Sequence, residues 1–207
     1  MKSLLFATGV VLCAAGMAAA QEASHFAFNI GGGFTEPVGT TGRYTDMGWN
    51  VGAGAGVNFN SWVGALVDVH YNDLGINSTT LQNIGVPGGG LHIFSATLDP
   101  IVHLTPKSHF DLYVTGGGGL YHRMQDFTAP GTATFTGYNP FFGFYPVTVG
   151  TTRILSSYSS NKPGWDAGVG IAFGSVWHGK FFAEARYNRT FDNHRTDFLP
   201  VTFGFRW

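Results

Sequence analysis

Eight stretches of the chain alternate apolar residues with small or polar ones at a period of two. In residues 48–59, for example, Trp49, Val51 and Val57 alternate with glycines and asparagines. Successive side chains of a β-strand point to opposite faces, so this pattern predicts strands with one apolar and one polar face. The expected strands cover residues 26–31, 48–59, 63–72, 94–104, 110–115, 165–173, 181–188 and 199–207.

The composition points to a membrane environment for these strands. Charged residues make up 11% of the 207 residues, against about 25% in typical globular domains. Aromatic residues reach 15%, and glycine occurs 31 times. After the first 20 residues, no segment offers the roughly 20 consecutive apolar residues of a spanning helix. Barrel strands need to be apolar on one face only, so we expect a membrane β-barrel.

The connections between the expected strands alternate in length. The short ones are residues 60–61, 105–108 and 174–179, and the long ones are 35–46, 74–90, 124–162 and 190–197. Outer-membrane barrels have short periplasmic turns and long extracellular loops in this alternation. The sequence therefore predicts an all-β fold, an eight-stranded antiparallel up-and-down transmembrane β-barrel.

The first 20 residues have the layout of a secretory signal peptide. Met1 and Lys2 give a positive start, an apolar run follows, and Ala18-Ala19-Ala20 forms a cleavage site. An uncleaved membrane anchor is the alternative interpretation. We expect cleavage before Gln21, which leaves residues 21–207 as one barrel domain. The single cysteine, Cys13, lies in the predicted signal peptide, so the mature domain has no disulfide.

Charged residues fall on the polar faces of the expected strands. Placing them against hydrocarbon would cost several kcal/mol each, so we expect them to face the lumen. An eight-stranded lumen is just wide enough for side chains, so opposite charges there should pair. We favour a salt-bridged plug over a gate or proton path. The expected lumen network comprises Asp68, His70, Asp99, Asp111, Asp166, Glu184, Arg186 and Arg206.

Large aromatic residues lie near the expected strand ends. Tryptophan and tyrosine concentrate where a membrane protein meets the polar headgroups. We therefore expect two girdles of interfacial aromatic side chains. Their candidate members are Trp49, Trp62, Tyr71, Phe110, Trp165, Tyr187 and Trp207.

The segment Leu199-Pro-Val-Thr-Phe-Gly-Phe-Arg-Trp207 resembles the terminal strand of bacterial outer-membrane proteins. It alternates apolar residues and ends in an aromatic one. The resemblance implies that the barrel-assembly machinery reads Phe203, Phe205 and Trp207 during insertion. We expect no periplasmic domain after Trp207.

Together with the signal peptide and the eight strands, the chain resembles the small OmpA/OmpX-like outer-membrane barrel superfamily. Stretches such as Gly85–Gly90, Gly116–Arg123 and Pro140–Pro146 are typical of an uncharacterised branch with an outer membrane protein β-barrel domain. The resemblance implies location in the bacterial outer membrane and contact with its lipid and lipopolysaccharide. The net charge of −1 gives no electrostatic basis for a nucleic-acid partner.

Residues typical of metal sites and catalysis occur, but not in the required patterns. The eight histidines show no H-E-x-x-H or similar spacing. His70 and His103 face inward, toward opposite ends of the barrel. An acyl-transfer site needs a serine, a histidine and a carboxylate together, yet Ser95 and His92 point to opposite faces of one strand. We therefore predict no metal, no cofactor and no catalytic residue.

The third long connection, residues 124–162, is rich in phenylalanine and tyrosine. An exposed apolar cluster can mark a binding surface for a partner or a hydrophobic ligand. The alternation at 132–136 and 147–154 instead favours an extended hairpin whose aromatic rings pack on each other. We favour the hairpin.

These features predict a non-catalytic integral outer-membrane protein with a structural or surface-interaction role, whose extracellular partner the sequence leaves unassigned. A narrow porin-like channel or a conduit for hydrophobic solutes is the first alternative. A lipid-modifying outer-membrane enzyme is the second.

Overall fold

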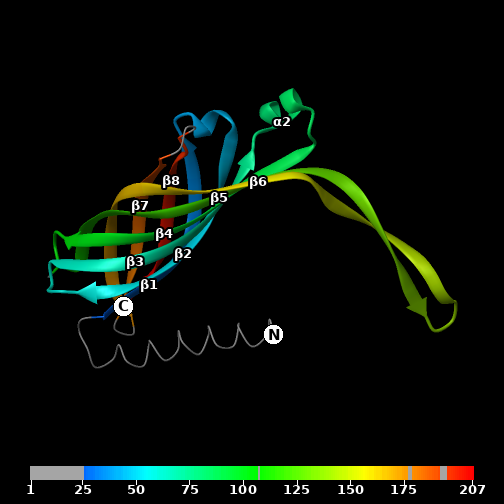
Figure 1. The fold of residues 1–207 in the computed structure, drawn as a ribbon. Helices are drawn as coiled ribbons and strands as arrows, with labels where there is room; N and C mark the ends of the chain where they lie inside the picture. Colours follow the sequence, from blue (N-terminus) through cyan, green and yellow to red (C-terminus); the bar gives the residue numbers. More distant parts are fainter. Residues whose placement is uncertain (1–25, 107, 177–178, 192–194) are drawn as a thin grey trace.

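The computed structural model describes residues 26–106, 108–176, 179–191 and 195–207. The predicted signal peptide lies outside these residues. Within them, eight antiparallel strands form a closed barrel in sequence order, with β8 pairing back to β1 (Figure 1). The predicted fold class is thus confirmed. The strands are β1 (Phe26–Val38), β2 (Thr45–Asn58), β3 (Val63–Ile76), β4 (Gly88–His103), β5 (Phe110–Asn139), β6 (Gly143–Val176), β7 (Gly179–Thr190) and β8 (Asp197–Arg206).

Several strands extend further toward the long-loop end than the alternation predicts. β1 continues to Val38, because Gly31-Gly32-Gly33 pairs with both neighbouring strands without showing an apolar period. β4 begins at Gly88, six residues before the expected start, because Gly88–Gly90 show no period and Leu91 and Ile93 place apolar side chains on the lumen face. Glycine carries no side chain to reveal the period, so the pattern underestimates these strands.

The connections have the predicted alternation of short and long. The long β1–β2 loop contains a 3-10 helix, η1 (Thr41–Arg43), and the β3–β4 loop contains a helix, α2 (Ser78–Ile84). The Asn77 side chain caps α2 by accepting a hydrogen bond from the Thr80 backbone N–H at 2.8 Å. Gly85 ends the helix in the left-handed conformation, with φ of 69°. Among the residues that the structure describes, no helix is long and apolar enough to cross a membrane.

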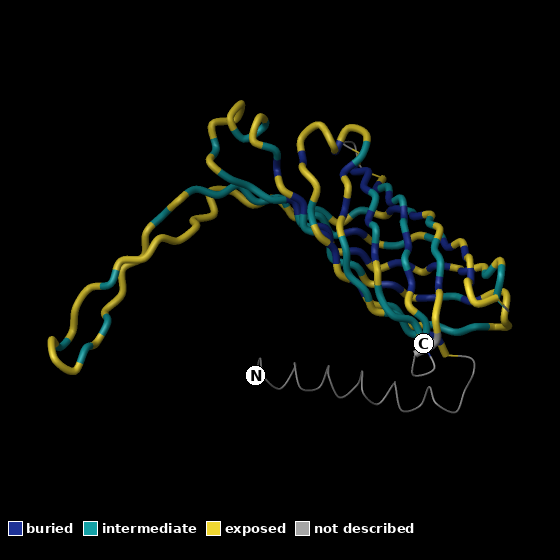
Figure 2. Tube along the Cα trace, turned by 180° about the vertical axis from the view of Figure 1, so that it is seen from behind, coloured by how far each residue is buried: buried dark blue, intermediate teal, exposed yellow. Residues whose placement is uncertain are grey.

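The third long connection is an extended β-hairpin, as favoured from its alternation. β5 and β6 pair from Phe110↔Phe173 to Asn139↔Gly143, while β4 accompanies β5 only as far as Thr128. The register of the hairpin shifts at Phe127/Thr128, at the point where β4 ends. Such a bulge bends a strand pair. Figures 1 and 2 show the resulting two-stranded ribbon curving away to the side of the barrel.

Buried and exposed residues alternate along the barrel strands (Figure 2). Val67, Leu98 and Val169 are each more than half exposed on the outside, which is the lipid face of a membrane barrel. Asp68, Asp99 and Glu184 are buried inside. The alternation therefore assigned the two faces of these strands correctly.

The lumen also holds apolar side chains, although we expected the inward faces of the strands to be polar or small. They form two clusters. On β3, which runs outward, Leu66 precedes Asp68 and Leu74 follows it; on β4, which runs inward, the order is Ile93, Asp99, Ile101. An apolar layer thus lies on each side of the buried charges. The inner layer comprises Ala27, Leu66, Ile101, Tyr113, Ala172 and Phe182, and the outer layer comprises Leu74, Leu91, Ile93, Tyr121 and Phe198.

Candidate functional site

Arg186 on β7 lies at the centre of a cluster of buried carboxylates in the lumen. Its Nη2 lies 2.7 Å from Glu184 Oε1 and 3.0 Å from Asp68 Oδ2, and its Nη1 lies 2.5 Å from Asp99 Oδ2. Asp166 Oδ1 is further away, 3.7 Å from Nη1. We call Arg186 and these four acids the lumen cluster. It joins strands β3, β4, β6 and β7 across the interior of the barrel.

Neutral side chains supply further hydrogen-bond partners to three of these carboxylates, although the buried Oδ1 atoms of Asp99 and Asp166 have none. Asn29 donates to Asp68 Oδ1 at 3.1 Å, and the Thr97 hydroxyl donates to Asp99 Oδ2 at 2.7 Å. The Tyr121 hydroxyl lies 3.4 Å from Asp166 Oδ2. Buried charges need this kind of support, because the desolvation that they suffer is large. The lumen cluster is therefore a hydrogen-bonded polar core.

Glycines on neighbouring strands make room for the large side chains that fill the lumen. A Cβ at Gly54 would lie 1.8 Å from Asp68 Oδ1, and one at Gly170 would lie 2.2 Å from the Tyr113 ring. Contacts this short are sterically forbidden. The glycine-rich strands thus allow close packing inside the barrel.

The other expected lumen residues lie outside the lumen cluster or at its edge. His70 faces the lumen beside it, with a buried Nδ1 that has no hydrogen-bond partner. Asp111 instead pairs with His103, at 2.7 Å, toward the short-turn end. Arg206 does not pair with Glu184, although their strands are adjacent. Its guanidinium stacks on the Tyr113 ring, 4.4 Å from the ring centroid.

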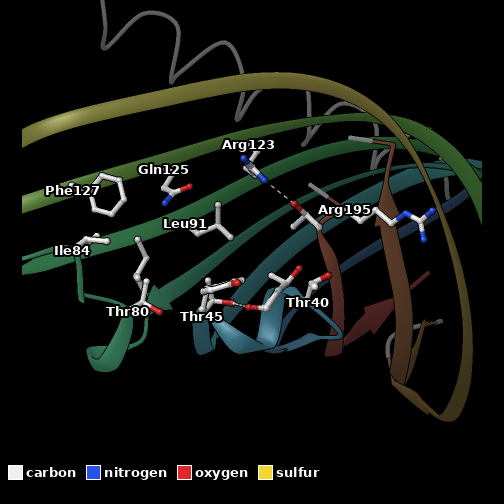
Figure 3. A pocket seen from close by; sticks show the side chains of 13 residues that line it. Thr40, Thr45, Thr80, Ile84, Leu91, Arg123, Gln125, Phe127 and Arg195 are labelled. Carbon is white, nitrogen blue, oxygen red and sulfur yellow. Dashed lines mark hydrogen bonds between the residues drawn. The ribbon is translucent and has the colours of Figure 1, made fainter. Parts of the chain in front are cut away.

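The barrel has a pocket at each end. The outer one, which we call the mouth pocket, has a volume of about 760 Å³ and lies among the long connections (Figure 3). The inner one has a volume of about 450 Å³ and includes His103, Asp111 and Arg206. Beside the lumen cluster, two cavities of about 10 Å³ each are lined by His70, Glu184 and Arg186. Each is large enough for about one water molecule.

The expected interfacial aromatics occupy both ends of the outer wall. Trp49 packs on Tyr71 with ring centroids 5.4 Å apart, and Trp165 packs on Tyr187 at 5.7 Å. Both pairs lie on the long-loop half of their strands. At the opposite end, Trp62, Phe110 and Trp207 are each at least 42% exposed. An aromatic band at each end of the outer wall fits the interfacial role, which stays a prediction.

The residues expected to form the assembly signal lie on the last strand. Phe203 is 52% exposed on the outer wall. The Phe205 ring contacts both Phe181 at 5.4 Å and Trp207 at 4.7 Å between centroids. This places an aromatic cluster on the outer wall at the short-turn end. Its recognition during assembly stays a prediction.

The structure places the residues that were weighed for metal binding and catalysis as follows. In them, no group of three or more histidine, cysteine or acidic side chains is placed to hold a metal ion. Ser95 is buried in the lumen, whereas His92 bonds to the Tyr71 hydroxyl on the outer wall at 3.0 Å. Ser156–Ser160 lies on the hairpin.

Two features of the site were missed from the sequence. Leu66 and Ile93 on the inner wall break the expected polar face, and neither the strand period nor the charges reveal them. The mouth pocket joins residues from five separate segments, which only the closed barrel brings together. A single available signal was the clustering of threonines in 40–45, which line one side of this pocket.

The comparisons with known proteins agree with this architecture. Neisserial surface protein A is 14% identical, with a TM-score of 0.56 over 87% of this chain and 95% of that one. A major outer membrane protein from Thermus thermophilus is 11% identical, with a TM-score of 0.57 over 88% of this chain and 98% of that one. At these identities the likeness shows the fold alone. A search of curated proteins gave no match.

A family model provides the assignment that the structural likeness cannot. The model of the outer membrane protein beta-barrel domain matches residues 6–206, which is nearly the whole chain. The location in the bacterial outer membrane follows from this match together with the apolar outer wall. The chain therefore belongs to the family of outer membrane β-barrel domain proteins.

Proposed function

We propose that this protein is a closed, non-catalytic barrel that anchors a surface-contact hairpin in the outer membrane. The observation that carries the proposal is the ribbon of β5 and β6 beyond Thr128. In the described structure these two strands pair there only with each other. Phe141, Phe142 and Phe144 at its tip are 89%, 85% and 77% exposed. Side chains this exposed bury almost none of their surface against the barrel.

The chemistry of the ribbon suits a neutral, apolar contact. Residues 128–152 contain no Asp, Glu, Lys or Arg, so electrostatic attraction cannot draw the ribbon to a charged partner. Apolar side chains at the boundary of a bilayer bind by burying their surface. The ribbon also curves to the side of the barrel instead of continuing along its axis (Figure 1). We infer that the tip rests on the outer leaflet around the barrel.

The interior supports an anchor over a channel. The lumen cluster fills the middle of the barrel, and an apolar layer lies on each side of it. A solute would have to break several charge-assisted hydrogen bonds and displace both layers. The alternative of a hydrophobic conduit through the lumen is disfavoured for this reason, and a lipid-modifying enzyme is disfavoured by the scattered positions of the serine and histidine side chains.

A nitroxide spin label at the tip tests the proposal. Full-length protein carrying Cys13→Ser and Phe142→Cys is labelled and placed in phospholipid vesicles. The collision rate of the label with oxygen, which concentrates in lipid, should exceed its collision rate with a water-soluble nickel chelate.

A label at Thr151→Cys, exposed on the uncharged stem of the ribbon, provides the control. It should favour the nickel chelate, because the stem lies above the bilayer. A tip label that behaves like the stem label contradicts the proposed contact.

A further inference from the structure

We infer that the mouth pocket binds a small, diffusible amphiphile that carries one anionic group on a hydrocarbon tail. Its volume of about 760 Å³ lies within the range of about 300–1,000 Å³ typical of small-molecule sites. The proposal rests on the lining of this pocket and is independent of the role of the hairpin tip.

One side of the mouth pocket is apolar. Ile84 from α2, Leu91 from β4 and Phe127 from β5 gather on this side (Figure 3). They come from three segments that only the folded barrel brings together. Ile84 is 49% exposed, although it is a large aliphatic side chain. An apolar surface inside a concave site is the expected counterpart of a hydrocarbon tail.

Two arginines line the pocket next to these apolar side chains, on the side away from Ile84 and Phe127 (Figure 3). Arg123 and Arg195 are the basic residues that line it, and no acidic residue occurs among the described residues of the lining. Neither guanidinium forms an ion pair with a carboxylate that the structure describes. Arg123 Nη1 donates to the Thr196 hydroxyl at 2.9 Å, while its buried Nε has no partner. Guanidinium groups with free donors are suited to a carboxylate, sulfate or phosphate.

The mouth pocket is closed at its floor and does not continue through the barrel. Leu91 belongs both to the pocket lining and to the outer apolar layer of the lumen. Below that layer lies the lumen cluster, centred on Arg186. A ligand that enters from outside therefore stops at the apolar layer, with its tail among apolar side chains and its charged group beside the arginines.

Equilibrium binding of radiolabelled decanoate to the full-length protein in phosphatidylcholine nanodiscs tests this assignment. Saturable binding above that of empty nanodiscs is expected. Decanol, which lacks the charge, and acetate, which lacks the tail, should each bind at least about tenfold more weakly. For decanol, the loss of one charge-assisted hydrogen bond is of this size. For acetate, the missing methylene groups remove at least as much buried apolar surface energy.

Two variants locate the site. Arg123→Gln and Arg195→Gln should each weaken decanoate binding about tenfold, while both keep the heat-modifiable migration of the folded barrel. Arg153→Gln, on the exposed hairpin, is the matched control and should bind as the unmodified protein does. Unchanged binding in both pocket variants would overturn the assignment, as would equal affinity for decanol.

A third arm distinguishes a diffusible ligand from the membrane's own anionic lipid. Lipid A is added to the nanodiscs before decanoate. Binding should persist, because the pocket opens to the outside between loops. Its complete loss would show that the acyl chains and phosphates of lipid A occupy the site, and would overturn the assignment of a diffusible amphiphile.

Discussion

Replacing Arg186 with methionine should strongly destabilise the barrel. Arg186 is 5% exposed, and three of its carboxylate partners lie within 3.0 Å of the guanidinium. Methionine is an unbranched, flexible and uncharged replacement, so the variant leaves four buried acids without their counter-charge. Removing one partner of a buried ion pair costs about 3–5 kcal/mol. We expect the free energy of unfolding to fall by about this amount.

Urea unfolding in phospholipid vesicles, followed by tryptophan fluorescence and by heat-modifiable migration, measures the loss. Arg153→Met on the exposed hairpin is the control and should change stability by less than about 0.5 kcal/mol. The loss in Arg186→Met should be smaller at about pH 5 than at about pH 8, because added protons neutralise the unpaired carboxylates.

The acids of the lumen cluster should respond differently from Arg186. Four carboxylates surround one guanidinium, so full ionisation would leave an excess of negative charge. Glu184→Gln removes part of that excess and leaves Arg186 bonded to Asp68 and Asp99. It should therefore cost less than about 1.5 kcal/mol. The reasoning fails if Arg186→Met unfolds at the same urea concentration as the unmodified protein, or if Glu184→Gln is the more damaging change.

Three further predictions concern packing, the hairpin and assembly. Gly170→Ala should lower the free energy of unfolding by about 1–3 kcal/mol, because its Cβ would overlap the Tyr113 ring. Gly150 has open space around it, so the control Gly150→Ala should unfold at the same urea concentration as the unmodified protein. Replacing residues 129–153 by Asn-Gly should leave the barrel fold and its urea midpoint unchanged, since the ribbon pairs only with itself; a loss of the heat-modifiable form would show that the ribbon supports the barrel. Trp207→Ser should reduce accumulation in the outer membrane of cells while refolding into detergent stays normal, and equal losses in both assays would point to a purely structural role.

Much of the barrel could be predicted from the sequence, because apolar and polar residues alternate along most strands and mark their two faces. Trp49, Val51 and Val57 face lipid, and their alternation with glycine and asparagine along the strand reveals this face. The hairpin followed from a second alternation in 132–136 and 147–154. The parts that failed are those where glycine hides the period, as in Gly31-Gly32-Gly33.

The partners inside the lumen could not be predicted in the same way. The charge of Arg186 and its inward direction were clear, but its choice of Asp68 and Asp99 over Asp111 depends on the stagger of strands that lie across the barrel. Arg206 illustrates the same limit, because adjacency of its strand to that of Glu184 did not make a pair. Such contacts depend on closure of the ring, which no local pattern encodes.

The apolar layers and the mouth pocket are also products of closure. Leu66 and Ile93 lie on faces that their neighbours mark as polar, so the pattern assigns them no special place. In the closed barrel they shield the lumen cluster from water at both ends, which strengthens its internal hydrogen bonds. The pocket forms where five segments meet above the outer layer.

The central claim is that the lumen is closed by the cluster around Arg186. Planar-bilayer recording on the unmodified full-length protein tests it most directly. We predict a baseline without discrete conductance steps in concentrated potassium chloride, under conditions in which a general porin gives clear openings. Reproducible discrete steps that disappear when the protein is heat-denatured before reconstitution would contradict the claim and support the alternative of a channel.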